Sequence, residues 1–96
     1  MGISENDIRK EVKTYLSCNG WFVFHNYQKG FKCYPGISDY TAIKNGIVLW
    51  IETKTLSGTQ SDSQLKFQED VESAGGYYVV ARGWPDVEKF IEEKIK

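Results

Sequence analysis

The dipeptide Asn45-Gly46 constrains the fold more than any other feature, because it joins two segments that both have the pattern of β-strands. Asparagine and glycine tolerate the positive φ angles of a two-residue hairpin turn. The segment after it, residues 47–54, is apolar on both faces as far as Ile51, a pattern typical of a central strand buried on both sides. The sequence therefore predicts an antiparallel hairpin within residues 35–54.

Charged residues lie at the end of this hairpin. Glu52 and Lys54 are two residues apart, so they project from the same face of the strand. Asp39 lies near the start of the partner strand, so pairing brings two carboxylates and one ammonium group together. Close carboxylates repel each other unless a cation lies between them, and Mg²⁺ commonly binds one or two protein carboxylates. A simple salt bridge at the strand end is the alternative interpretation.

Three short motifs resemble those of the VRR-NUC domain, a branch of the PD-(D/E)xK nuclease superfamily. They are Gly36-Ile37-Ser38-Asp39, Glu52-Thr53-Lys54, and Gly58 followed by Ser61 and Gln64. The resemblance spans nearly the whole chain. It departs from the family pattern at Ser38, where the usual residue is proline; proline binds no metal, so we expect little effect on activity. Because little else accompanies the motifs, the chain resembles the small standalone, viral-type members, including those carried by phage.

The resemblance implies a role for each motif residue. Asp39 and Glu52 are expected to bind the metal together with the backbone carbonyl of Thr53. Lys54 is the expected catalytic lysine, and Gln64 an accessory active-site residue. Since Ser61 and Gln64 also have the spacing of a helix capping box, a purely local role for Gln64 stays open.

A further candidate lies on the first predicted helix, residues 4–19. Glu5 is spaced to project from its core-facing side. The simple interpretation is that an acid in the first turn offsets the helix dipole. The resemblance implies instead that Glu5 reaches the metal, with Glu11 as the second candidate.

A basic and aromatic loop, residues 28–34, leads into Asp39. It is either an ordinary solvated loop or a DNA-contacting one, in which lysines bind phosphates and aromatic rings contact sugars or bases. The sole histidine precedes it on a predicted strand, residues 21–27, and is interpreted as a structural or phosphate-contacting residue. The candidate DNA-binding residues are Lys29, Lys32, His25, Phe31 and Tyr34.

Composition fits one small domain that spans residues 1–96. The chain has 96 residues, of which 41% are hydrophobic, enough for one core and little more. A formal net charge of −1 provides no overall attraction to DNA, so a DNA-binding surface must be a local patch. Cys18 and Cys33 lack metal-ligand spacing and are expected to be reduced structural thiols in the cytoplasm. No run is long and apolar enough to predict a membrane span.

The predicted order of elements is α-β-β-β-α-β-α, with the last three at residues 62–74, 77–82 and from Pro85 onward. We therefore predict an α/β fold, a mixed β-sheet flanked by helices, consistent with the restriction-endonuclease-like core that the resemblance implies.

The function expected from these features is Mg²⁺- or Mn²⁺-dependent hydrolysis of DNA phosphodiesters by a metal-activated water. The resemblance extends to Holliday-junction resolvases, which implies an endodeoxyribonuclease that acts as a homodimer on branched DNA. A nuclease for flaps or plain duplex DNA is one alternative. A non-catalytic nucleic-acid-binding module is another, and the intact set of Asp39, Glu52 and Lys54 argues against it.

Overall fold

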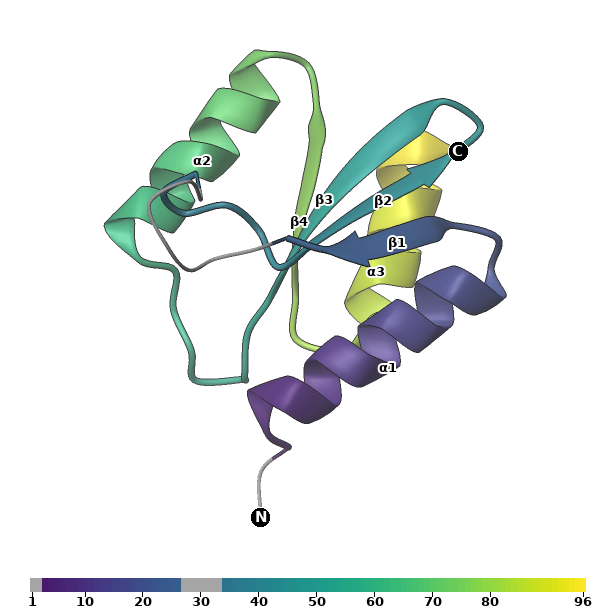
Figure 1. Cartoon of the computed structure of the whole chain (residues 1–96), viewed down its shortest axis with the longest axis horizontal. Coiled ribbons are helices and arrows are strands. Elements are labelled where there is room, and N and C mark those ends of the chain that lie inside the picture. The colour runs from purple at the N-terminus through teal and green to yellow at the C-terminus, as the bar shows by residue number, and fades with distance from the viewer. Residues whose placement is uncertain (1–2, 27–33) are drawn as a thin grey trace.

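Four strands form one mixed sheet in the order β1-β2-β3-β4 (Figure 1). The computed structural model describes residues 3–26 and 34–96, and its elements follow the predicted order. They are α1 (Glu5–Cys18), β1 (Phe22–His25), β2 (Tyr40–Lys44), β3 (Ile47–Thr53), α2 (Asp62–Ser73), β4 (Tyr77–Ala81), α3 (Trp84–Phe90) and a π-helical turn (Ile91–Ile95).

The predicted hairpin is confirmed. Asn45 and Gly46 have φ angles of 52° and 79°, as a two-residue turn between β2 and β3 requires. β1, β2 and β3 pair antiparallel, whereas β4 lies parallel to β3 after the crossover through α2. The sheet is therefore mixed, as predicted, with β3 between a parallel and an antiparallel neighbour.

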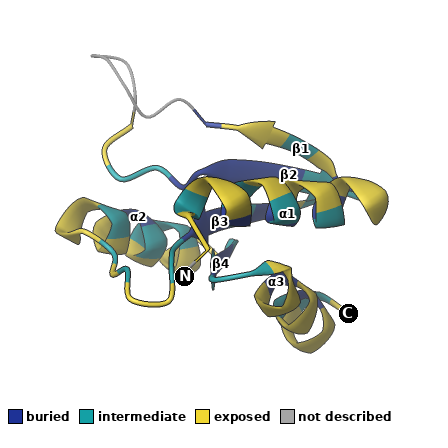
Figure 2. Cartoon of the chain, turned by 90° about the horizontal axis from the view of Figure 1, so that it is seen from below, coloured by how far each residue is buried: buried dark blue, intermediate teal, exposed yellow. Residues whose placement is uncertain are grey.

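The main core lies between one face of the sheet and helices α1 and α3 (Figures 1 and 2). Alternate residues of β3, Leu49 and Ile51, are fully buried there against Val12 and Leu16 of α1 and Val87 of α3. Their spacing on each element follows the period of that element, two for strands and three to four for helices. This packing fixes the position of α1 relative to the end of β3 that carries Glu52.

The opposite face of the sheet is covered only in part, so the prediction that β3 is buried on both sides is wrong for its first half. Phe67 of α2 packs against Trp50 and Tyr78, with ring centroids 5.4 and 6.1 Å apart. Val48, two residues before Trp50, is 37% exposed. Helix α2 covers only the end of the sheet that carries Glu52, so this face stays open near the Asn45-Gly46 turn.

The first strand, the last helix and Cys18 differ from the sequence-based expectations. The first strand is shorter than residues 21–27, and residue 27 lies outside the described residues. The last helix begins at Trp84, one residue before the expected Pro85, and ends in a π-helical turn. Cys18 is an exposed free thiol rather than a packed structural one, and Cys33 lies outside the described residues.

Among the described helices, none has the length and apolar character needed to cross a membrane.

Candidate active site

Asp39 and Glu52 meet at the end of the β2-β3 hairpin, where each is only 1% exposed. The backbone before β2 is held in place by Asn26, the residue that follows β1. The Asn26 N–H donates to the carbonyl of Asp39 at 2.8 Å, and the Asn26 amide donates to the carbonyl of Ser38 at 3.0 Å. Ser38 is fully buried and donates to the Tyr40 carbonyl. Hydrogen bonds thus orient the segment that leads to Asp39.

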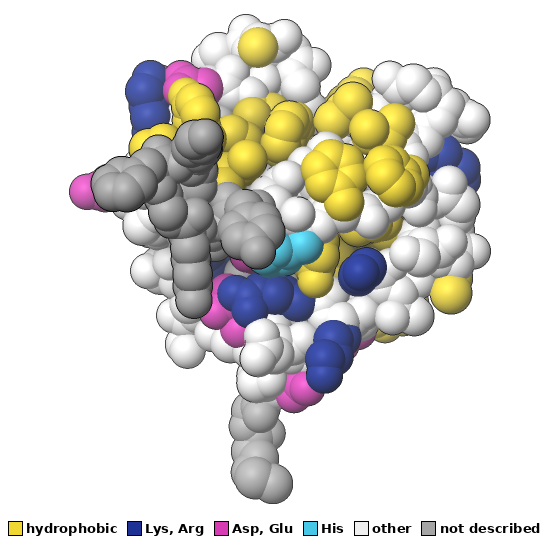
Figure 3. All heavy atoms as spheres, in the orientation of Figure 1, with side chains coloured by type: hydrophobic (Ala, Val, Ile, Leu, Met, Phe, Trp, Pro, Cys, Tyr) yellow, Lys and Arg dark blue, Asp and Glu magenta, His cyan; other side chains and the backbone are white. Residues whose placement is uncertain are grey.

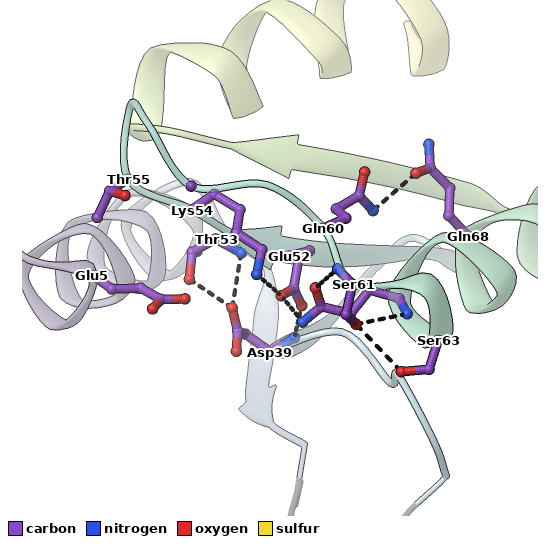
Figure 4. A network of polar contacts seen from close by, with 12 residues as sticks. Glu5, Asp39, Glu52, Thr53, Lys54, Thr55, Gln60, Ser61, Ser63 and Gln68 are labelled. Carbon is purple, nitrogen blue, oxygen red and sulfur yellow. Dashed lines mark hydrogen bonds and ion pairs between the residues drawn. The ribbon is translucent and has the colours of Figure 1, made fainter.

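A closed set of hydrogen bonds links the two acids (Figure 4). The backbone N–H of Asp39 donates to Glu52 Oε1 at 3.1 Å. In the other direction, Thr53 donates to Asp39 Oδ2 from its backbone nitrogen at 2.8 Å and from its hydroxyl at 2.6 Å. These bonds fix both carboxylates relative to the backbone of β3.

The second oxygen of Glu52 faces two further donors. Gln64 Nε2 lies 2.8 Å from Glu52 Oε2, and Lys54 Nζ lies 3.6 Å from the same oxygen. Lys54 follows Glu52 on the same face, as the strand spacing predicts. The ammonium group is also largely buried, since the Lys54 side chain is 15% exposed.

Gln64 has both of the roles that the sequence left open. Its Oε1 accepts from the Ser61 N–H at 2.9 Å, and the Gln64 N–H donates to Ser61 Oγ at 3.2 Å, which completes the capping box of α2. Because the amide oxygen caps the helix, the amide nitrogen must face Glu52. A single side chain therefore connects the start of α2 to the candidate site.

Gly36 allows this arrangement. It has a φ angle of 75°, and a Cβ at this position would lie 2.0 Å from the Ser63 carbonyl oxygen. Only glycine permits both the backbone conformation and the close approach. The segment that leads to Asp39 can therefore lie directly against the first turn of α2.

Burial and charge act strongly on Glu52. Loss of solvent, followed by the nearby charge of Asp39, raises the pKa of Glu52 to about 7, although Lys54 and the Asp39 N–H act in the opposite direction. A carboxyl group with such a pKa is only partly ionised at neutral pH. A divalent cation between the two acids would favour the ionised form.

The first turn of α1 approaches the acids from the other side. Figure 4 shows Glu5 directed from α1 toward Asp39. Its carboxylate pairs with Arg9 at 3.4 Å, and Arg9 Nε lies 3.6 Å from Asp39 Oδ1. Glu11, the second candidate for a metal ligand, instead accepts a hydrogen bond from the Trp84 N–H at 2.8 Å and is occupied at the start of α3.

Two of the five predicted DNA-contacting residues can be placed. His25 is exposed at the end of β1, with its ring edge-on to Tyr40 at 5.4 Å. Tyr34 is 56% exposed and packs edge-on against Phe67 of α2. Lys29, Lys32 and Phe31 lie outside the described residues.

The donor set suits a hard divalent cation. Asp39 and Glu52 supply carboxylate oxygens and Thr53 a backbone carbonyl, the ligand types that Mg²⁺ and Mn²⁺ prefer. Within residues 3–26 and 34–96, no three His, Cys, Asp or Glu side chains are grouped as ligands. Glu5 is paired with Arg9 in this conformation, so the set consists of two carboxylates rather than three.

Two contributors escaped the sequence analysis. The Thr53 hydroxyl binds Asp39, although only the backbone of this residue was considered. Arg9 contacts both Glu5 and Asp39. The only sequence signal for Arg9 was its position four residues after Glu5, which is also the spacing of an ordinary helix surface pair.

Comparison with known proteins identifies the fold. A solved structure described as a VRR_NUC domain matches with a TM-score of 0.78 and 22% sequence identity, covering 94% of this chain and 96% of that chain. No protein-family model and no curated protein matches the sequence. The chain thus has the fold of a VRR_NUC domain, and the fold expected from the motifs is confirmed.

Proposed function

We propose that residues 1–96 act as one metal-dependent DNA endonuclease domain. The observation that carries the proposal is the convergence of buried Asp39 and Glu52 with Lys54 at the end of one hairpin. A chance salt bridge between Glu52 and Lys54 does not require a second buried acid whose backbone N–H donates to Glu52. The VRR_NUC fold of the chain supports the same function.

The residues have distinct roles in this proposal. Asp39, Glu52 and the Thr53 carbonyl would hold Mg²⁺ or Mn²⁺, which supplies a Lewis acid and lowers the pKa of a bound water. Lys54 orients the attacking water and stabilises charge on the phosphate as an ammonium group, or deprotonates the water as a neutral amine. Gln64 keeps Glu52 in place through its 2.8 Å hydrogen bond. Glu5 joins the ligands only if it leaves Arg9.

We propose branched DNA, such as a four-way junction, as the substrate. So small a domain offers little surface for reading a base sequence, so recognition of DNA shape is the favoured mode. Figure 3 shows several Lys and Arg side chains beside the apolar part of one face, with Asp and Glu side chains among them. These local basic side chains would contact DNA phosphates, since the formal net charge of −1 provides no overall attraction.

A homodimer fits this substrate, because two symmetric cuts in a four-way junction require two sites. Figure 3 shows hydrophobic side chains over the uncovered part of the sheet. Phe22 and Phe24 of β1 are 65% and 40% exposed there, and Val48 of β3 lies on the same face. This apolar surface at an edge strand would form the contact between two-fold-related copies. Trp84, exposed in the α3 segment, is the second site to test.

The test is a cleavage assay on four-way junction, flap, plain duplex and supercoiled plasmid DNA, each with Mg²⁺, with Mn²⁺ and with a chelator. The proposal expects metal-dependent cuts, strongest on the junction. Binding to DNA without cleavage under any condition would favour a non-catalytic module. Sedimentation at micromolar concentration tests the dimer, with Phe22→Ser expected to shift the protein toward a monomer of 11.0 kDa.

A further inference from the structure

A cation of the chain itself already lies beside the carboxylates. The Arg9 guanidinium lies 3.6 Å from Asp39 Oδ1 through Nε and 3.4 Å from Glu5 Oε1 through Nη2. Its third nitrogen, Nη1, donates to Asn6 Oδ1 at 2.8 Å. The guanidinium therefore bridges an acid from the hairpin and an acid from α1.

The Arg9 Nε–H is buried, and the described residues offer it no hydrogen-bond partner. Its 3.6 Å separation from Asp39 Oδ1 is too long for a hydrogen bond, so the attraction is one of charge. A surface pair between Glu5 and Arg9 alone would leave this nitrogen in water. Its burial beside an acid that is 1% exposed indicates that Arg9 compensates the charge of Asp39.

We propose that Arg9 is the resident counter-cation of the carboxylate site and competes with the divalent metal for Asp39 and Glu5. This inference rests on the proposed metal site. Two positive groups beside Asp39 repel each other, so the presence of Arg9 weakens metal binding. Glu5 becomes available as a ligand only when its pair with Arg9 breaks. Arg9 thus sets the metal affinity and stabilises the site when no metal is bound.

The alternative is that Arg9 organises the ligands and favours metal binding. The two roles predict opposite changes when the charge is removed. Arg9→Met keeps the aliphatic part of the side chain and removes the guanidinium. Lys10→Met is the matched control, because Lys10 is an exposed neighbour on the same helix and its loss changes the net charge equally.

The experiment is a calorimetric Mn²⁺ titration of the wild-type protein, Arg9→Met, Arg9→Lys and Lys10→Met. We expect Arg9→Met to lower the Kd about ten-fold, the scale of one nearby unit charge at a partly screened site. Arg9→Lys, which keeps the charge, should change it less, and Lys10→Met by less than about two-fold, as expected of an exposed charge. Without metal, Arg9→Met should melt below the wild type, and saturating Mn²⁺ should raise its Tm by more.

Unchanged or weaker Mn²⁺ binding by folded Arg9→Met would overturn the inference, as would equal tightening by Lys10→Met. If Arg9→Met does not fold, Arg9→Gln carries the same comparison. If the wild-type protein binds Mn²⁺, and Asp39→Asn abolishes binding while Arg9→Met leaves it unchanged, only the role of Arg9 fails. If the wild-type protein neither binds Mn²⁺ nor cuts DNA, the proposed function itself fails, and this inference with it.

Discussion

The two halves of the site bury their carboxylates equally but compensate them differently. On the side of α1, Asp39 accepts two hydrogen bonds from Thr53 and faces the guanidinium of Arg9. On the side of α2, Glu52 accepts two hydrogen bonds, from the Asp39 N–H and the Gln64 side-chain amide, and faces the ammonium group of Lys54 at 3.6 Å. The pKa of Glu52 rises to about 7 even so, mainly because of burial. The comparison teaches that the cation beside Asp39 comes from a separate element, helix α1, whereas the cation beside Glu52 comes from the same segment of chain as the acid.

The starts of the two helices repeat this contrast. Both α1 and α2 begin with a capping box, Ser4 with Asp7 and Ser61 with Gln64. Asp7 is exposed and only caps its helix, whereas Gln64 also reaches Glu52. The same local motif is therefore confined to the helix in one case and part of the site in the other.

The strongest test asks whether both halves are needed. We expect Asp39→Asn and Glu52→Gln each to abolish cleavage, because each replaces an anionic metal ligand with a neutral amide of the same shape. The measurements are the cleavage rate and the Mn²⁺ affinity, with circular dichroism to show that the fold is intact. Glu11→Gln, an acid held at α3, is the control and should stay active. Activity in either site variant, with metal binding unchanged, would remove that residue from the site.

The next test distinguishes the role of Lys54 from that of Glu52. Lys54→Ala should lower the cleavage rate on the order of 10²–10³-fold, the scale of losing one group that stabilises transition-state charge. The Mn²⁺ affinity should change far less, since an ammonium group is not a ligand. Lys44→Ala, at the far end of β2, is the control for loss of a lysine. A comparable fall in Mn²⁺ binding would instead indicate a structural salt bridge with Glu52.

The pH dependence of stability tests the burial of Glu52. Its folded-state pKa is raised from 4.5 to about 7, so the folded protein holds this proton more tightly than the unfolded chain does. The stabilisation is fully present below pH 4.5 and is lost as the pH rises through about 7. Without metal, the wild-type protein should therefore lose up to about 3 kcal/mol relative to Glu52→Gln across this window. Denaturant unfolding of both proteins at several pH values measures the difference, and a constant difference would contradict the raised pKa.

The smallest effect distinguishes the two capping boxes. Gln64→Ala and Asp7→Ala both remove the side chain that completes a box, so each should destabilise the fold by about 1 kcal/mol or less. Only Gln64→Ala should also slow cleavage, by roughly 10- to 100-fold, because it frees a metal-binding carboxylate from a neighbouring hydrogen bond. Measuring the cleavage rate and the Tm of both variants shows whether Gln64 acts beyond its helix cap. Equal rates would confine Gln64 to its cap.

The sequence predicted the hairpin and the order of elements because local signals carried them. Asn45-Gly46 accepts positive φ angles, and the apolar spacing of each segment matches its period. The exposure of Val48 could not be predicted, since it depends on how much of the sheet α2 covers. The local sequence pattern determines which side chains each face of a strand carries, but not which neighbouring element covers that face.

The candidate site divides in the same way. Asp39, Glu52 and Lys54 could be grouped from strand alternation and one turn. The position of Arg9 next to Asp39 depends on where α1 lies along the sheet. The packing of Val12 and Leu16 against the sheet determines that position. The sequence could not show whether Gln64 caps α2 or contacts the site, because its amide oxygen does the first and its amide nitrogen the second.

Because one amide group of Gln64 binds both Ser61 and Glu52, a change at Glu52 should also change the hydrogen bond of the Ser61 N–H. The Ser61 N–H donates to Gln64 Oε1, while the nitrogen of the same amide group donates to Glu52. Any event that pulls Glu52 away from Gln64 loosens the first turn of α2 at the same time. The exchange rate of one amide proton, followed by NMR during a metal titration, would therefore register what happens at a carboxylate it never touches.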